Sequence, residues 1–220
     1  MRSLIFLVVI TLILHSKPSL AQQQGRYDGD IKTILAYDNM YKAPPQPIVF
    51  VGSSSIRKWD DLQQFFGSYR VINRGIGGAV INDIINYTDQ LIVRYKPRQV
   101  VLYVGDNDIT NANETADTLV NRTIRLYRLL RGKLPDVPLI YINIKPSPSR
   151  EKYRDKIELT NKMLKQFFAG ESNVIFLDIY SLMLSGNGQF RRELFQKDMI
   201  HMLPEGYAIW ENAIKPYLLR

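Results

Sequence analysis

Three adjacent serines, Ser53 to Ser55, follow a short apolar run and a glycine in the stretch IVFVGSSSIRKW, residues 48–59. Neighbouring serines are common in loops, but a serine hydroxyl beside a general base can also act as a nucleophile. The chain contains two histidines, and the first, His15, lies in an apolar N-terminal segment. His201 is therefore the histidine available to activate one of these serines. A lone histidine is more often a structural residue, so this count alone does not decide its role.

A serine nucleophile also needs an acid that orients the base and donors that stabilise a developing oxyanion. Asp198 lies three residues before His201 and could hold the imidazole in one tautomer. The N–H of Gly78, the side-chain amide of Asn107 and the N–H of the serine itself are candidate donors. Ordinary alternatives exist, because glycine pairs form tight turns and asparagine caps helices. The residue types alone leave these alternatives open.

Cysteine is absent from the chain. Its absence excludes disulfides, a thiolate nucleophile and cysteine-based metal sites. A zinc site would need more ligands than one histidine with scattered acidic residues provides. We therefore expect neither a metal ion nor an organic cofactor.

The candidate residues must be positioned by elements that alternate along the 220-residue chain. Apolar, β-branched runs occur at 48–51, 71–72, 100–104, 139–144 and 174–177, and segments of helical period at 31–41, 81–95, 116–131, 150–168 and 205–218. This alternation predicts a parallel sheet with helices on both faces. Gly132 and Pro135 are expected to end the helix that begins at residue 116. In open α/β sheets, sites form at the carboxyl ends of the strands, where the serines, Gly78 and Asn107 fall.

The N-terminus is expected to lie outside the folded domain. Arg2 precedes an apolar run at 4–14, and SLA at 19–21 is a small-x-small cleavage site, which is the pattern of a secretory signal peptide. The apolar run is shorter than the roughly 20 residues of a transmembrane helix, although an uncleaved membrane anchor is the alternative. We assign residues 1–21 to a signal peptide, 22–47 to an N-terminal lead-in, loose at 22–30, with a Pro-rich entry loop at 43–47, and 48–220 to the functional domain. The protein is then exported to the periplasm or secreted.

The formal net charge of +8 raises the question of a nucleic-acid partner. The basic residues are spread along the chain in runs no longer than two, and export argues against an intracellular nucleic acid. We therefore expect a solvated basic surface and no nucleic-acid partner. Affinity for an anionic polysaccharide or a membrane surface is the alternative, without stable membrane insertion after signal cleavage.

Four blocks occur in the order Ser, Gly, Asn and Asp-x-x-His, namely FVGSSSIRKW, INRGIGG, GDND and DMIHMLPEGY. With these blocks, the chain from about residue 48 to the C-terminus resembles the SGNH hydrolase superfamily, also called GDSL-type esterases and lipases. The resemblance implies a three-layer α/β/α sandwich of flavodoxin-like type with a five-stranded parallel sheet. It also implies ester hydrolysis through an acyl-enzyme. The roles that it implies are Ser54 as nucleophile, the Ser54 N–H, the Gly78 N–H and the Asn107 amide as oxyanion donors, Asp198 as acid and His201 as base.

The chain departs from the family pattern at two positions. Ser53 stands where the family's name block has Asp, and Gly-Ser-Ser-Ser-Ile-Arg resembles a subgroup near the platelet-activating-factor acetylhydrolase catalytic subunits. Ala79 follows Gly78 where relatives often have Asp or Ser. The Gly-x-Ser-x-Gly elbow of α/β-hydrolases is missing, because no glycine follows Ser54 by two residues. We expect Ser55 to begin the helix that follows.

These inferences predict an exported serine esterase that cleaves small acyl esters, such as acetyl esters, of a small molecule, glycan or lipid. The alternative is a catalytically silent carbohydrate- or lipid-binding protein on the same fold. The segment IKPSPSR follows the fourth predicted strand and borders the predicted site. Lys145, Ser147 or Arg150 could contact substrate there, although a plain loop is the simpler interpretation. Trp59 and Trp210 are expected to be core residues.

Overall fold

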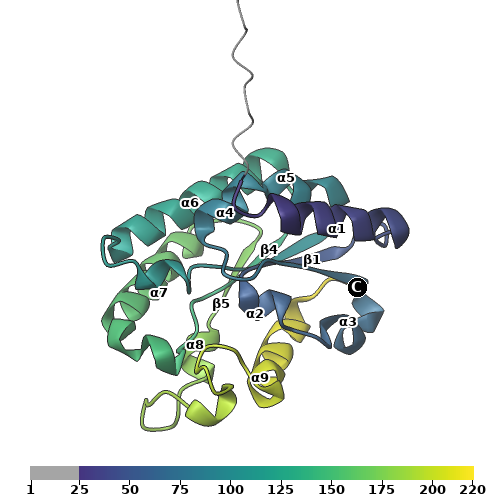
Figure 1. Cartoon of the computed structure of the whole chain (residues 1–220). Coiled ribbons are helices and arrows are strands. Elements are labelled where there is room, and N and C mark those ends of the chain that lie inside the picture. Colours follow the sequence, from purple (N-terminus) through teal and green to yellow (C-terminus); the bar gives the residue numbers. More distant parts are fainter. Residues whose placement is uncertain (1–24) are drawn as a thin grey trace, which may run out of the picture.

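A five-stranded parallel sheet forms the centre of the computed structural model, which describes residues 25–220 (Figure 1). The strands are β1 (Ile48–Gly52), β2 (Val71–Gly75), β3 (Gln99–Tyr103), β4 (Leu139–Ile142) and β5 (Val174–Leu177). Their spatial order is β2-β1-β3-β4-β5, and each neighbouring pair is parallel. The predicted sheet is therefore confirmed. The predicted signal peptide at 1–21 lies outside the described residues.

Helices cover both faces of the sheet (Figure 1). One face is covered by α1 (Asp28–Met40), α4 (Ile81–Asn86), α5 (Thr88–Leu91), α6 (Ala116–Lys133) and α7 (Arg154–Ala169). The other face is covered by α2 (Ser54–Arg57), α3 (Leu62–Phe65), α8 (Ile179–Leu182) and α9 (Pro204–Ile214). Short 3₁₀ turns are η1 (Gly67–Tyr69), η2 (Val93–Tyr95), η3 (Asp108–Thr110), η4 (Pro148–Tyr153), η5 (Arg192–Leu194) and η6 (Lys215–Tyr217). The arrangement is the predicted three-layer α/β/α sandwich.

The sheet separates two apolar cores, because successive side chains of a strand point to opposite faces. On β1, Val49 and Val51 pack in the core on the α6 side, whereas Ile48 and Phe50 pack in the core on the α9 side. Every residue of β1 is buried. A central parallel strand covered on both faces is therefore apolar throughout, which is why its sequence shows no polar alternation.

An aromatic cluster in the core on the α9 side fixes the position of α2. Trp59 and Trp210 are 1% and 0% exposed, which confirms that both are core residues. The ring centroids of Trp59 and Tyr207 lie 5.0 Å apart. The Tyr207 hydroxyl also donates a hydrogen bond of 2.9 Å to the Ser55 carbonyl, so α9 holds the short α2 helix against the sheet.

Two segments that were predicted as single helices are interrupted. The segment 81–95 is divided into α4, α5 and η2, because the backbone leaves the helical conformation at Tyr87 (φ −109°, ψ 19°) and at Ile92 (φ −130°, ψ −65°). The helix predicted at 205–218 ends at Ile214, since Pro216 has no N–H for the next helical hydrogen bond.

Two predicted helix boundaries are wrong. Ser55 lies inside α2, whose first residue is Ser54 and whose N-cap is Ser53. The extended backbone of β1 continues through Ser53, so the helix begins at the next residue. Gly132 lies inside α6. The Leu134 N–H still donates to the Leu130 carbonyl at 2.7 Å, so the helical ladder passes Gly132.

Residues 25–30 are not a loose lead-in, contrary to the prediction. Tyr27 is 7% exposed and α1 begins at Asp28. The Tyr27 N–H donates to the Tyr87 hydroxyl at 3.4 Å, and this hydroxyl donates to Asp28 at 2.8 Å. With Ile31 also buried, the start of α1 is anchored on the core beside α5.

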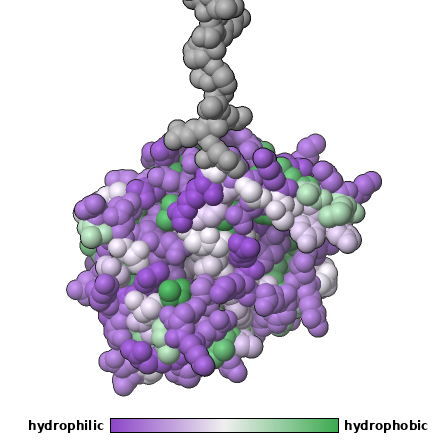
Figure 2. Space-filling model, viewed as in Figure 1, coloured by the Kyte–Doolittle hydropathy of each residue, from purple (hydrophilic) through white to green (hydrophobic). Residues whose placement is uncertain are grey.

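The face of the molecule in Figure 2 is mostly hydrophilic, with hydrophobic residues scattered over it. Three large exposed side chains, Tyr37, Met40 and Tyr41, lie near the end of α1. Within residues 25–220, no helix is both long enough and apolar enough to cross a bilayer.

Gly52→Ala is expected to destabilise the fold by more than about 4 kcal/mol. Gly52 ends β1 with φ +147°, and a Cβ there would lie 1.7 Å from the Tyr103 carbonyl oxygen. Urea unfolding would measure the loss. Gly132→Ala is the control, because a Cβ at Gly132 meets no atom within 4 Å and alanine should stabilise the helix by about 0.5–1 kcal/mol. An unchanged unfolding midpoint for Gly52→Ala would contradict the role of this close approach.

Candidate active site

Ser54 lies at the carboxyl end of β1, where the strand order of the sheet reverses. From β1 the chain moves to β2 on one side and then to β3 on the other, and ligand sites of open α/β sheets form at such a point. The Ser53 N–H donates to the Tyr103 carbonyl at 3.1 Å, which extends the β1–β3 ladder beyond β1. Ser54 then begins α2, so its own N–H belongs to the first helical turn, where amides have no intrahelical acceptor.

Asp198 and His201 lie together on one short loop. The Gln196 N–H donates to the His201 carbonyl at 2.7 Å, which closes the loop. Met199 makes the sharp turn within it, with φ +57°. Asp198 Oδ1 accepts the N–H groups of Ile200 and His201, both at 3.0 Å. These bonds fix the carboxylate relative to the backbone that carries the imidazole.

Ser54, His201 and Asp198 form a hydrogen-bonded chain. His201 Nε2 lies 3.1 Å from Ser54 Oγ, and His201 Nδ1 lies 2.5 Å from Asp198 Oδ2. When Nδ1 donates to the carboxylate, the lone pair of Nε2 faces the hydroxyl. A general base needs this geometry, with one ring nitrogen near the proton to be removed and the other held by an acid. Residues 147 positions apart in the sequence thus meet at one edge of the sheet.

The Asp198 carboxyl is held in its charged form. Partial burial would raise its pKa, but hydrogen bonds from the His201 N–H, the His201 ring and the Ile200 N–H outweigh burial and lower the pKa of Asp198 below its ordinary value. Asp198 is therefore ionised at neutral pH and can stabilise a positive imidazolium.

Lys58 places a positive charge beside this hydrogen-bonded chain. It follows Ser54 by four residues, and its Nζ lies 3.2 Å from His201 Nδ1. Because Nδ1 donates to Asp198, the ammonium acts on this pair as a charge and not as a donor to the ring. Lys58 was not predicted as a site residue from the sequence, although its spacing of one helical turn from Ser54 places it on the same side of the helix.

The candidate oxyanion donors lie on loops that contact each other. Gly78 has φ +75°, a conformation that glycine adopts without strain. The Asn107 amide donates to the Ala79 carbonyl at 2.9 Å, which leaves its second N–H for a ligand. The Asn107 side chain makes no helix-capping bond to η3. In the part of the chain that the structure describes, the N–H groups of Ser54 and Gly78 have no backbone acceptor.

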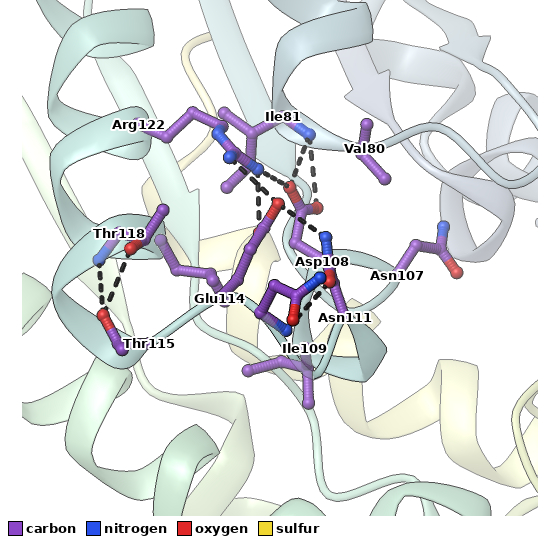
Figure 3. A network of polar contacts seen from close by, with 12 residues as sticks. Val80, Ile81, Asn107, Asp108, Ile109, Asn111, Glu114, Thr115, Thr118 and Arg122 are labelled. Carbon is purple, nitrogen blue, oxygen red and sulfur yellow. Dashed lines mark hydrogen bonds and ion pairs between the residues drawn. The ribbon is translucent and has the colours of Figure 1, made fainter.

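Asp108 ties the Asn107 turn to the loop that carries Gly78 (Figure 3). Both of its carboxylate oxygens accept the Ile81 N–H at 3.2 Å, and Oδ1 accepts from Arg122 at 3.1 Å. Arg122 also pairs with Glu114 at 2.9 Å (Figure 3). Burial raises the pKa of Asp108 to about 6, against the lowering effect of the bonds from Ile81 and Arg122.

The start of α1 forms a wall beside the Gly78 loop. The Tyr27 hydroxyl and the Arg26 guanidinium lie 3.4 and 3.8 Å from the position that a Cβ on Gly78 would take. Arg57 on α2 pairs with Asp30 on α1 at 3.2 Å. The segment from Arg26 into α1 thus contacts both the Gly78 loop and the helix that begins with Ser54.

The segment that follows β4 borders the site, as predicted, but two of its polar side chains face inward. Lys145 and Ser147 are both 0% exposed, so they are buried beside the site and do not line its open side. The Ser149 N–H donates to the Met199 carbonyl at 3.1 Å, which joins this segment to the Asp198–His201 loop. Among residues 25–220, no group of three or more His, Cys, Asp or Glu side chains is arranged to hold a metal ion.

A model of the GDSL-like lipase/acylhydrolase family matches residues 47–209. The chain belongs to this family. The match covers most of the chain and includes every residue of the candidate site from Ser54 to His201. The protein is accordingly a hydrolase of ester bonds.

Solved structures share the fold of this GDSL-like acylhydrolase. A Streptococcus pneumonia protein provisionally described as a platelet activating factor is 23% identical over 87% of this chain and 92% of its own, with a TM-score of 0.75. A GDSL-like lipase from Bacteroides thetaiotaomicron is 21% identical over 86% and 97%, with a TM-score of 0.74. An acetylxylan esterase from Geobacillus stearothermophilus is 15% identical over 78% and 93%, with a TM-score of 0.61. The comparison with curated proteins gave no significant match.

Asp108→Asn is expected to change how stability depends on pH. The pKa of Asp108 in the folded protein, about 6, exceeds the ordinary value of 3.8. The stabilisation that Asp108 gives to the folded state is therefore complete below about pH 4 and is lost as the pH rises through about 6. Relative to Asp108→Asn, the free energy of unfolding of the wild type should fall by about 2–3 kcal/mol between about pH 4 and about pH 7.5, at about 1.36 kcal/mol per pKa unit. Urea unfolding of both proteins at both pH values measures this change. Groups common to both proteins, including Asp198, cancel in the difference, and a difference independent of pH would refute the prediction.

Proposed function

We propose that the protein is an exported serine esterase that cleaves small acyl esters, such as acetyl esters, through an acyl-enzyme intermediate. The observation that carries the proposal is the chain of hydrogen bonds from Ser54 Oγ to His201 Nε2 at 3.1 Å and from His201 Nδ1 to Asp198 at 2.5 Å. Its place at the carboxyl end of β1 supports the same reaction, because the loops that carry Gly78 and Asn107 leave the neighbouring strands at the same register.

In the first half of the reaction, Ser54 Oγ attacks the ester carbonyl carbon while His201 Nε2 accepts the hydroxyl proton. The negative charge that develops on the carbonyl oxygen is stabilised by the Ser54 N–H, the Gly78 N–H and the Asn107 amide. Asp198 stabilises the positive charge on the imidazolium. The bond between the carbonyl carbon and the alcohol oxygen then breaks, and His201 gives its proton to the leaving alcohol.

In the second half, a water molecule repeats this sequence on the acyl-enzyme. His201 accepts one proton from the water as its oxygen attacks the acyl carbon, and the same donors stabilise the oxyanion. The bond to Ser54 Oγ breaks, and Ser54 receives the proton from His201. The acid is released and the enzyme returns to its starting state.

A small acyl group is supported by two observations. The wall formed by Arg26 and Tyr27 stands against the Gly78 loop, so it limits the space beside the oxyanion donors. The fold is also shared with an acetylxylan esterase. Acetylated saccharides and short-chain acyl esters are therefore the first substrates to test. The block Gly-Ser-Ser-Ser-Ile-Arg supports a place near the platelet-activating-factor acetylhydrolase catalytic subunits.

Ser54→Ala is expected to lower kcat for a short-chain nitrophenyl ester by about 10⁴-fold or more, because the nucleophile is lost. Ser53→Ala is the matched control on the neighbouring serine. It should keep at least about a tenth of the activity, since the Ser53 side chain makes no capping bond to α2. Circular dichroism would show that both variants are folded. An inactive Ser53→Ala beside an active Ser54→Ala would place the nucleophile one residue earlier.

A fluorophosphonate probe should label the wild type on the peptide that contains Ser54. His201→Ala should remove this labelling, because the serine then lacks its base. Absence of labelling and of turnover on a broad ester panel, together with thermal stabilisation by a saccharide or lipid, would favour the binding-protein alternative.

Export rests on the signal-peptide pattern at 1–21. Protein recovered from the periplasm or medium of an expressing bacterium should begin at Gln22 in N-terminal sequencing. A chain that keeps Met1 and sediments with membranes would instead indicate the uncleaved anchor.

A further inference from the structure

A buried ion pair lies directly beneath the Asn107 turn. The Lys145 side chain is 0% exposed and its Nζ lies 2.6 Å from Asp106 Oδ2, whose side chain is 3% exposed. The Tyr103 hydroxyl lies 3.3 Å from the same ammonium, and the Ser147 hydroxyl lies 3.5 Å from the same carboxylate oxygen. Neither Lys145 nor Asp106 takes part in a catalytic step of the proposed mechanism.

Stability alone is a weak explanation for this pair. Removing two charges from water costs free energy that their attraction often fails to return, and well-packed apolar side chains are frequently as stable or more stable. Asp106 Oδ1 is also buried and has no hydrogen-bond partner among the described residues, 25–220. A charged pair in such a place points to a role in geometry.

Asp106 immediately precedes Asn107, whose amide is an oxyanion donor in the proposed mechanism. The turn begins at Gly105 with φ +117°. Asn107 is bonded to the Ala79 carbonyl on one side of the turn. On the other side of the turn, the Asp106 carboxylate accepts a bond from Lys145, which lies on the segment that follows β4. Lys145 is therefore placed to fix the backbone from which the Asn107 side chain projects.

The segment that contains Lys145 also contacts the other half of the site. Four residues after Lys145, the Ser149 N–H donates to the carbonyl of Met199, at 3.1 Å. Met199 lies between Asp198 and His201 in the sequence. The short segment 145–149 thus contacts the Asn107 turn through Lys145 and the Asp198–His201 loop through Ser149.

We propose that Lys145 and Asp106 are positioning residues that hold the Asn107 amide in the oxyanion hole. The inference rests on the proposed esterase function. It separates these two residues from ligand-binding residues, because both are closed off from the open side of the site.

The test uses the full chain with both charges removed together, Lys145→Met/Asp106→Leu, so that no lone buried charge prevents folding. We expect a melting temperature close to that of the wild type, a kcat about 10–100-fold lower and a KM changed less than about 3-fold. An exposed pair, Lys133–Asp89 at 2.8 Å, gives the matched control Lys133→Met/Asp89→Leu, which should keep wild-type kcat. The substrate is the same short-chain nitrophenyl ester.

A coupling measurement shows whether the pair acts through Asn107. Asn107→Ala should lower kcat by about 10²–10³-fold. If the pair only positions this amide, adding Lys145→Met/Asp106→Leu to Asn107→Ala should lower kcat no further than about 2-fold, because residues that act as one unit are not additive.

Wild-type kcat in the charge-free variant would overturn the proposal, and so would fully additive losses in the triple variant. Failure of the esterase proposal itself has a different outcome, because the wild type would then show neither turnover nor labelling of Ser54. The two results are therefore distinguishable in one set of assays.

Discussion

The site depends on the strand register, because the last residues of β1, β2 and β3 are paired with one another. Gly52 is paired with Gly75 on one side and with Tyr103 on the other. The three loops that follow therefore leave the sheet at the same height, and they carry Ser54, Gly78 and Asn107. The hydrogen bond from Ser53 to Tyr103 requires a backbone approach that only glycine permits at position 52. A side chain there would separate β1 from β3 and move Ser54 away from the Asn107 turn.

Three aspartates near the site differ in their surroundings and therefore in what they can do. Asp198 has a side chain that is 43% exposed, and backbone and ring donors keep it ionised. Asp108 and Asp106 are almost fully buried and are bonded to neighbouring segments, to Ile81 and Arg122 in one case and to Lys145 in the other. The first can respond to charge that forms on His201. The other two maintain the shape of the turn between them.

Much of this arrangement could be predicted from the sequence, because the strands are continuous apolar runs and three of the four blocks directly follow a strand. The single histidine beyond residue 21 also limited the choice of base. The break after α4 was not predictable, since the bonds of the Tyr87 hydroxyl to Tyr27 and Asp28 are tertiary contacts that a helical pattern in the sequence does not show. The Lys145–Asp106 pair was missed for a related reason. A lysine in a Pro-rich loop looks solvated, and only the packing of β3 against β4 shows that it is enclosed.

The contact between α1 and the Gly78 loop has a practical consequence for recombinant work. Arg26 and Tyr27 lie against the Gly78 loop, so a purification tag or fusion partner joined just ahead of Gly25 enters beside the candidate site. The C-terminus is held at the amino ends of the strands, opposite the carboxyl ends that carry the site. There the Leu219 N–H donates to the side chain of Gln99, the first residue of β3. A tag placed after Arg220 therefore leaves from the amino ends of the strands, opposite the carboxyl ends near Ser54.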